Sequence, residues 1–162
     1  MSSTISNLNS CDENEKIYWD DLALGQQFNF GEYYVSEEEI IDFALRYDPM
    51  EFHTDPKKAK LSPIGVLCAS GIHTIGIMQR LTYDNIYKNW HMVAGKELSS
   101  CRFIRPVIPN DTLAVTMIVK DIHQGNRSDR GLINLAFSLT NSHQQVVLEV
   151  EGLIVMLKRS LL

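Results

Sequence analysis

The sequence predicts an α+β domain in which one antiparallel sheet packs around a helix. After one strand-like segment, the first half of the chain contains three segments with helical signals. From about residue 95 the pattern changes to alternating or Val, Ile and Leu-rich segments bounded by turn residues. Because short loops join these segments, we expect successive strands to pair antiparallel. The 162 residues suit one domain, and an apolar content of 44% supports a packed core.

Residues 1–15 are rich in Ser, Asn and acidic residues, so we expect a disordered polar tail before a single domain at residues 16–162. The tail lacks the apolar segment of a signal peptide, and no apolar run approaches the roughly 18–20 residues that cross a bilayer. We therefore expect a cytoplasmic protein with no membrane partner. The net charge of −5 argues against nucleic acid as a partner, because phosphate binding requires an excess of Lys and Arg.

The spacing of the cysteines and histidines bears on disulfides and metal sites. Cys11, Cys68 and Cys101 are widely spaced and odd in number, which favours free thiols in a reducing compartment over disulfides. Cys68 is interpreted as a small buried apolar residue rather than a nucleophile. The chain has no H-x-x-x-H or C-x-x-C spacing, so we expect no metal site.

The first elements are predicted by local signals. A strand is expected near residues 27–35, where aromatic and β-branched residues mix. Ser36 and Glu39 then have the spacing of an S-x-x-E capping box, which marks the start of a helix. Pro49 disfavours helical geometry at the residue before it, so this helix is expected to end at Asp48.

The segments after this helix complete the expected order of elements. His53 should lie in an irregular segment, and Asp55 before Pro56 predicts a short helix with Asp55 as its N-cap rather than a catalyst. From about Ala69 the chain forms a helix that is apolar around much of its surface, which is typical of a buried helix. Four strands are expected to follow, at residues 95–107, 111–123, 131–142 and 144–159.

Three blocks in this order resemble the MaoC-like acyl dehydratase family. They are "YDPMEFHTDPKKA" at 47–59, "PIGVLCASGIHT" at 63–74, and "FIRPVIPNDTL" at 103–113. The third is similar to the family's R-P-V-x-P-G-D-T-L block, and the resemblance runs over roughly residues 17–158. It implies the hotdog fold, an antiparallel β-sheet wrapped around a long central α-helix. It also implies a homodimer, and leaves open whether dimers associate further.

The resemblance also implies an activity. This is the (R)-specific hydration of a trans-2-enoyl thioester, or dehydration of a 3-hydroxyacyl thioester, carried by coenzyme A or acyl carrier protein. Asp48 and His53 would be the catalytic pair that activates one water and moves protons, and Gly71 would offer its N–H to the thioester oxygen. Ser70, Phe52 and Ile72 would contact the substrate. The reaction needs no metal or other cofactor.

The chain departs from the family pattern close to these residues. The family's hydratases often have D-x-N-P-x-H, whereas Pro49 directly follows Asp48 here. Ser70 stands where characterised hydratases often carry His, and Asn110 replaces a turn Gly, a change that its tolerance of left-handed geometry permits. The catalytic pair is kept while its surroundings differ, so the acyl group is left open.

Other interpretations of the same residues stay open. Asp48 and His53 can be a helix-ending acid and a loop histidine, Gly71 can serve close packing, and Ser70 can be an N-cap. A hotdog thioesterase is the nearest alternative enzyme, and it would release free thiol. A non-catalytic acyl-thioester-binding module, or a structural subunit of another active chain, would bind without turnover.

Overall fold

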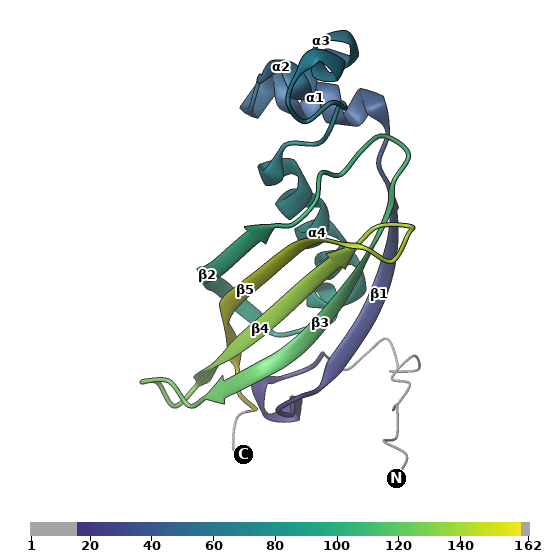
Figure 1. Ribbon diagram of the computed structural model, residues 1–162. Coiled ribbons are helices and arrows are strands. Elements are labelled where there is room, and N and C mark those ends of the chain that lie inside the picture. Colours follow the sequence, from purple (N-terminus) through teal and green to yellow (C-terminus); the bar gives the residue numbers. More distant parts are fainter. Residues whose placement is uncertain (1–15, 160–162) are drawn as a thin grey trace.

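The computed structural model describes residues 16–159, and the expected tail at residues 1–15 lies outside them. These residues form one five-stranded sheet in the order β1-β3-β4-β5-β2 (Figure 1). All four neighbouring pairs are antiparallel, and β3, β4 and β5 pair in succession as expected. The expectation is wrong for β2, which pairs with β5 and not with β3, the strand that follows it after a short loop. The strands are β1 (Gln27–Tyr34), β2 (Met92–Phe103), β3 (Thr112–His123), β4 (Arg130–Thr140) and β5 (Val146–Leu157).

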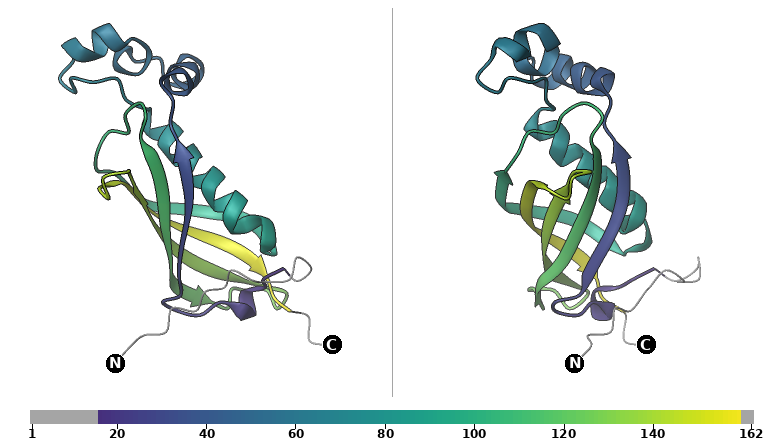
Figure 2. Two further views of the ribbon diagram at one scale, coloured as in Figure 1. Left: turned by 90° about the vertical axis from the view of Figure 1, so that its right-hand side faces the viewer. Right: turned by 45° about the vertical axis from the view of Figure 1, so that its right-hand side comes forward.

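One face of the sheet holds the core. Alternate residues of the inner strands are buried there because side chains of a strand point to opposite faces in turn. This row includes Val115, Met117 and Val119 on β3 and Ile133 and Leu135 on β4. Helix α4 (Gly71–Asn85) lies along this part of the molecule, and contacts β1 and β3 (Figure 2).

The buried side of α4 carries polar as well as apolar residues. Ile77, Met78 and Leu81 join the core cluster, and His73 and Thr74 are buried beside them. The opposite side of α4 is open, and Ile72 is 59% exposed. The expectation of a helix buried around most of its surface is therefore wrong for this side.

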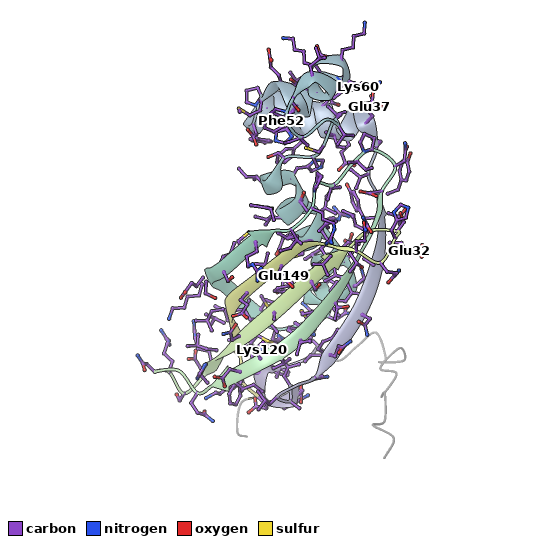
Figure 3. The ribbon with its side chains drawn as sticks, in the orientation of Figure 1. Glu32, Glu37, Phe52, Lys60, Lys120 and Glu149 are labelled. Carbon is purple, nitrogen blue, oxygen red and sulfur yellow. The ribbon has the colours of Figure 1, made fainter. Side chains whose placement is uncertain are left out.

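Three helices lie together beyond one end of the sheet, and we call residues 37–61 the helical cap (Figures 1 and 2). They are α1 (Glu37–Tyr47), α2 (Glu51–Thr54) and α3 (Pro56–Leu61). Figure 3 labels Glu37, Phe52 and Lys60 on this cap, and Lys120 and Glu149 on the sheet. Two short 3-10 helices complete the described elements, η1 (Trp19–Asp21) and η2 (Tyr87–Asn89).

Helix α1 starts and ends where the sequence predicts, but its capping box is incomplete. The Ser36 hydroxyl accepts a hydrogen bond from the Glu39 backbone N–H at 3.1 Å. The Glu39 carboxylate bonds Tyr33 and His73 instead of returning to the Ser36 backbone. The predicted reciprocal bond is therefore wrong, because tertiary partners compete successfully for this carboxylate. Asp48 is the C-cap of α1.

In the rest of the cap, the expectation for His53 is wrong and the expectation for Asp55 is confirmed. His53 lies in α2 rather than in an irregular segment, because its N–H bonds the Met50 carbonyl at 2.9 Å and closes a short helical turn. Asp55 is the predicted N-cap of α3, and its carboxylate accepts from the Lys57 and Lys58 N–H groups at 2.8 and 3.2 Å. No helix within residues 16–159 has the length and apolar character needed to cross a membrane.

Candidate functional site

Asp48, His53 and Ser70 meet where the helical cap adjoins the start of α4. Asp48 ends α1, His53 lies in α2, and Ser70 directly precedes α4. The His53 Nε2 atom is 3.6 Å from Asp48 Oδ2, and the Ser70 hydroxyl donates to the same oxygen at 2.6 Å. The bend at Pro49 thus brings together an acid and a histidine whose sequence spacing does not fit one helix face.

The orientation of the His53 ring fixes which nitrogen carries the proton. Its Nδ1 atom lies 2.6 Å from the Cys68 carbonyl oxygen, and a carbonyl can only accept. Nδ1 therefore carries the hydrogen, and in the neutral ring Nε2 has a free lone pair on the side of Asp48. The 3.6 Å separation from Asp48 Oδ2 is longer than a direct hydrogen bond, so both atoms keep bonding capacity.

Neighbouring groups hold the His53 side chain in place. The Phe52 ring packs edge-on against it with centroids 4.4 Å apart. The Cys68 N–H donates to the Phe52 carbonyl at 3.2 Å, which ties α2 to the segment that enters α4. The His53 side chain is 9% exposed whereas that of Asp48 is 32% exposed, so the site opens to solvent on the Asp48 side.

Ser70 has a different role from the N-cap that local sequence suggests. It occupies the N-cap position of α4, but its side chain makes no capping hydrogen bond. The hydroxyl is fully buried and is directed to Asp48 instead. Because the hydroxyl donates to a carboxylate oxygen, Ser70 fixes the orientation of Asp48 as an acceptor.

Gly71 is the first residue of α4, so its N–H belongs to the donors that have no acceptor inside the helix. A Cβ atom built on Gly71 would lie 2.6 Å from Cζ of Phe103, so no side chain fits without moving that ring. Phe103 and Ile72 are 56% and 59% exposed, so an apolar surface borders Gly71. The exposed Phe103 ring thus occupies the space of a Gly71 side chain, and the Gly71 N–H lies next to Ser70, the partner of Asp48.

A second polar cluster, which the sequence did not predict, lies between α1, α4 and β1. The Tyr33 hydroxyl donates to Glu39 Oε1 at 2.5 Å, and His73 Nε2 is 3.0 Å from the same oxygen. The three residues line an open groove of about 570 Å³. The sequence feature that could have indicated this cluster is His73, a histidine within a largely apolar helix.

The cysteines fit their predicted structural roles where they are described. Cys68 and Cys101 are both free thiols, and Cys11 lies outside the described residues. Cys68 is buried, and burial raises the pKa of its thiol, which disfavours the nucleophilic thiolate. Within residues 16–159 no three His, Cys, Asp or Glu side chains are grouped as a metal site.

The chain is similar to known proteins over most of its length. The chain is 33% identical over 140 residues to the uncharacterised protein YdeM of Bacillus subtilis strain 168, covering 86% of this chain and 98% of that protein. The crystal structure of a MaoC-like dehydratase from Rhodospirillum rubrum superposes with a TM-score of 0.79 at 28% identity, over 90% of this chain and 99% of that one.

An (R)-hydratase from Pseudomonas aeruginosa has the same fold, with a TM-score of 0.69 at 19% identity over 90% of this chain and 88% of that one. This fold is the hotdog fold. The profile of the MaoC-like domain matches residues 21–141, about three quarters of the sequence. With that match and a relative 33% identical over most of its length, the chain belongs to the MaoC-like domain family.

Proposed function

We propose that this protein is a hydro-lyase that hydrates trans-2-enoyl thioesters, or dehydrates 3-hydroxyacyl thioesters, with (R) specificity. Membership of the MaoC-like family and the likeness to a dehydratase and an (R)-hydratase support hydratase or dehydratase chemistry in general. The observation that carries the proposal is the pair of atoms Asp48 Oδ2 and His53 Nε2, 3.6 Å apart, which both retain the capacity to bind one water.

In the proposed reaction, the water oxygen bonds C3 of the enoyl group while His53 Nε2 takes one water proton. The electron pair of the C2=C3 bond moves towards the thioester and forms an enolate. The His53 imidazolium then returns its proton to C2, so that one H and one OH are added in total. Asp48, held by Ser70, accepts a hydrogen bond from the second O–H of the water, whose hydrogen stays on the product hydroxyl, and it stabilises the imidazolium.

Gly71 would stabilise the enolate oxygen through its backbone N–H. The start of a helix favours negative charge, and a donor of this kind contributes on the order of 10²–10³ in rate. Phe52 and Ile72 would contact the acyl group on either side of the pair. The reaction needs no cofactor other than the thioester itself, carried by coenzyme A or acyl carrier protein.

We further propose that two chains form a homodimer along β2. This strand is one edge of the sheet, and its residues from Val93 to Phe103 are exposed. An unpaired edge strand with exposed Val93, Leu98 and Phe103 is suited to pairing with a second copy. In such a dimer α4 would become the central helix of the hotdog fold, and the apolar surface beside Gly71 would be covered.

The decisive experiment adds purified protein to crotonyl-CoA, to longer trans-2-enoyl-CoAs and to the acyl carrier protein thioesters. Hydration is followed as the loss of enoyl-thioester ultraviolet absorbance, and free thiol is measured in parallel. We expect absorbance loss without thiol release, with the rate about 10³-fold lower in Asp48→Asn and strongly reduced in His53→Ala. Thiol release would identify a thioesterase, and acyl-CoA binding without turnover would identify a binding module.

A further inference from the structure

The Tyr33–Glu39–His73 cluster joins three elements through one carboxylate oxygen. Tyr33 lies on β1, Glu39 in the first turn of α1 and His73 in the first turn of α4. Glu39 Oε1 accepts from the Tyr33 hydroxyl at 2.5 Å and faces His73 Nε2 at 3.0 Å. The cluster therefore connects the helical cap to both the sheet and the helix that begins at the site.

The directions of the hydrogen bonds in the cluster follow from the chemistry of its members. Burial and the adjacent Glu39 carboxylate raise the pKa of Tyr33 to about 12, so this hydroxyl stays a donor at any assay pH. A carboxylate only accepts, so His73 presents its Nε2–H to Glu39. Among residues 16–159 His73 Nδ1 is buried without a hydrogen-bond partner, which costs stability.

A cluster that leaves a buried nitrogen unsatisfied is a poor way to gain stability alone, because an apolar residue would fill the same space without that cost. The cluster contributes more to the placement of α1 than to stability. His73 is 4% exposed and its ring stacks on Phe43 of α1, with centroids 4.5 Å apart and planes within 8°. Phe43 in turn contacts Tyr47, the residue before Asp48, with centroids 4.9 Å apart.

Helix α1 is thus attached to the start of α4 at two separate points. One is the Ser70–Asp48 hydrogen bond at the C-terminal end of α1, and the other is His73, which faces Glu39 and stacks on Phe43. Glu39 and Asp48 are nine residues apart, or about 13 Å along a helix that rises about 1.5 Å per residue. A single attachment lets a helix pivot, whereas two attachments at this separation fix its direction.

We propose that Tyr33, Glu39 and His73 are positioning residues, which fix the direction of α1 and so hold the Asp48 carboxylate in line with His53. The proposal rests on the proposed function for its kinetic test. None of the three residues contacts the reacting atoms, and they act only through Asp48. A misplacement of about 1 Å at a reacting group can lower a rate by roughly 10²-fold. Loss of one contact in the Tyr33–Glu39–His73 cluster should therefore lower kcat measurably.

The first test removes single hydroxyl groups from β1. Tyr33→Phe deletes the bond to Glu39, and Tyr34→Phe is the matched control, because the Tyr34 hydroxyl donates to Asn110 outside the helical cap. We expect Tyr33→Phe to lower kcat about 10-fold with KM within about twofold, and Tyr34→Phe to change neither. An unchanged kcat in Tyr33→Phe, or an equal loss in both variants, would overturn the proposal.

The second test separates positioning from a merely structural role. Because the cluster acts through Asp48, Tyr33→Phe should cause no further loss of kcat in an Asp48→Asn background, measured at high enzyme concentration. An equal fold-loss in both backgrounds would show that Asp48 is not involved. His73→Gln keeps an N–H donor for Glu39 and should retain most of kcat, whereas His73→Leu should not. Equal losses in these two variants would also contradict the proposal.

A third measurement does not depend on turnover. Hydrogen–deuterium exchange of the α1 amides should be faster in Tyr33→Phe than in wild type or Tyr34→Phe, with the β4 amides as an internal reference. If wild type hydrates no thioester, the proposed function fails while exchange still tests the attachment of α1. Unchanged α1 exchange would show that the cluster does not fix this helix.

Discussion

The sheet and the helical cap are held together by different forces. On β3 and β4 the inward residues are almost fully buried hydrophobic side chains, such as Val119 and Leu135, both 0% exposed. The cap buries only a few side chains, and Leu45, Tyr47 and Leu61 are 61%, 66% and 89% exposed. Its attachment to the body of the molecule includes the polar contacts of Asp48, Glu39 and His53.

This contrast separates stability from chemistry. Apolar burial gives the sheet most of its free energy, and that energy is insensitive to direction. Hydrogen bonds contribute less net energy but depend on distance and angle, so they are suited to placing a carboxylate relative to an imidazole. Damage to the sheet should therefore appear as lost folding, and damage to the cap as lost rate.

The largest expected effect is on the cap side of this comparison. Asp48→Asn removes the charge beside His53 but keeps the shape, and we expect kcat to fall about 10³-fold. The melting temperature should stay close to that of wild type, because Asp48 contributes little apolar burial. Stopped assays and calorimetry measure the two quantities. Asp42→Asn, an exposed acid on the same helix, is the control, and a similar loss there would refute a specific role for Asp48.

The matching change in the sheet is Leu135→Ala. Because Leu135 is 0% exposed on an inner strand, we expect the free energy of unfolding to fall by about 2–5 kcal/mol. The kcat per folded molecule should not change. Denaturant titration measures the free energy of unfolding, and rates normalised to the concentration of active sites measure kcat per folded molecule. Leu45→Ala on the cap, at 61% exposed, should cost far less stability, and a loss as large as that of Leu135→Ala would break the comparison.

Helix α4 belongs to both regions and offers a pair of glycines. Gly71→Ala places a Cβ where the Phe103 ring lies, so we expect kcat/KM to fall roughly 10–100-fold while the protein still folds, since that exposed ring can move. Steady-state kinetics measures the loss. Restored activity in Gly71→Ala/Phe103→Ala would assign the loss to the displaced ring, and a persistent loss would assign it to the approach of the thioester.

Gly76 is the control on the same helix. A Cβ at Gly76 meets no atom within 4 Å, so Gly76→Ala should leave kcat/KM unchanged. It should raise the free energy of unfolding by about 0.5–1 kcal/mol, because alanine loses less conformational freedom in a helix. A loss of stability at Gly76 would mean that the helix is strained there.

The smallest expected effect concerns the N-cap of α3. The backbone N–H groups of Lys58 and Lys57 lower the pKa of Asp55 below its ordinary 3.8. A lowered folded-state pKa contributes stability above the unfolded pKa, and this contribution is lost as the pH falls through the folded value. The melting temperature of Asp55→Ala should thus lie slightly below that of wild type at pH 7. The difference should shrink below pH 3.8, and a constant difference would exclude this origin.

The sequence predicted those features that local patterns determine. Strand alternation, the Ser36 and Asp55 caps and the break at Pro49 depend on neighbours in the chain, and they appear as expected. The family resemblance pointed to Asp48 and His53, and the structure places them together, although their catalytic role is still a proposal.

The remaining features depend on contacts between distant segments. Glu39 has the right spacing for a capping box, yet Tyr33 and His73 offer its carboxylate a buried alternative that spacing cannot show. Ser70 likewise stands at a helix start, but its hydroxyl meets an acid 22 residues earlier. In both cases the side chain had two chemically reasonable partners, and only tertiary packing chose between them.

The carbonyl oxygen that orients His53 comes from the main chain of Cys68, and the thiol of the same residue lies 3.7 Å from the same Nδ1 atom. Cys68→Ala removes the thiol but keeps the carbonyl, so it should keep the proton on Nδ1 and leave activity close to that of wild type. The site thus contains a group that natural variation cannot delete, because every amino acid supplies a carbonyl. Only replacing the peptide linkage itself by chemical synthesis would expose what this carbonyl oxygen contributes.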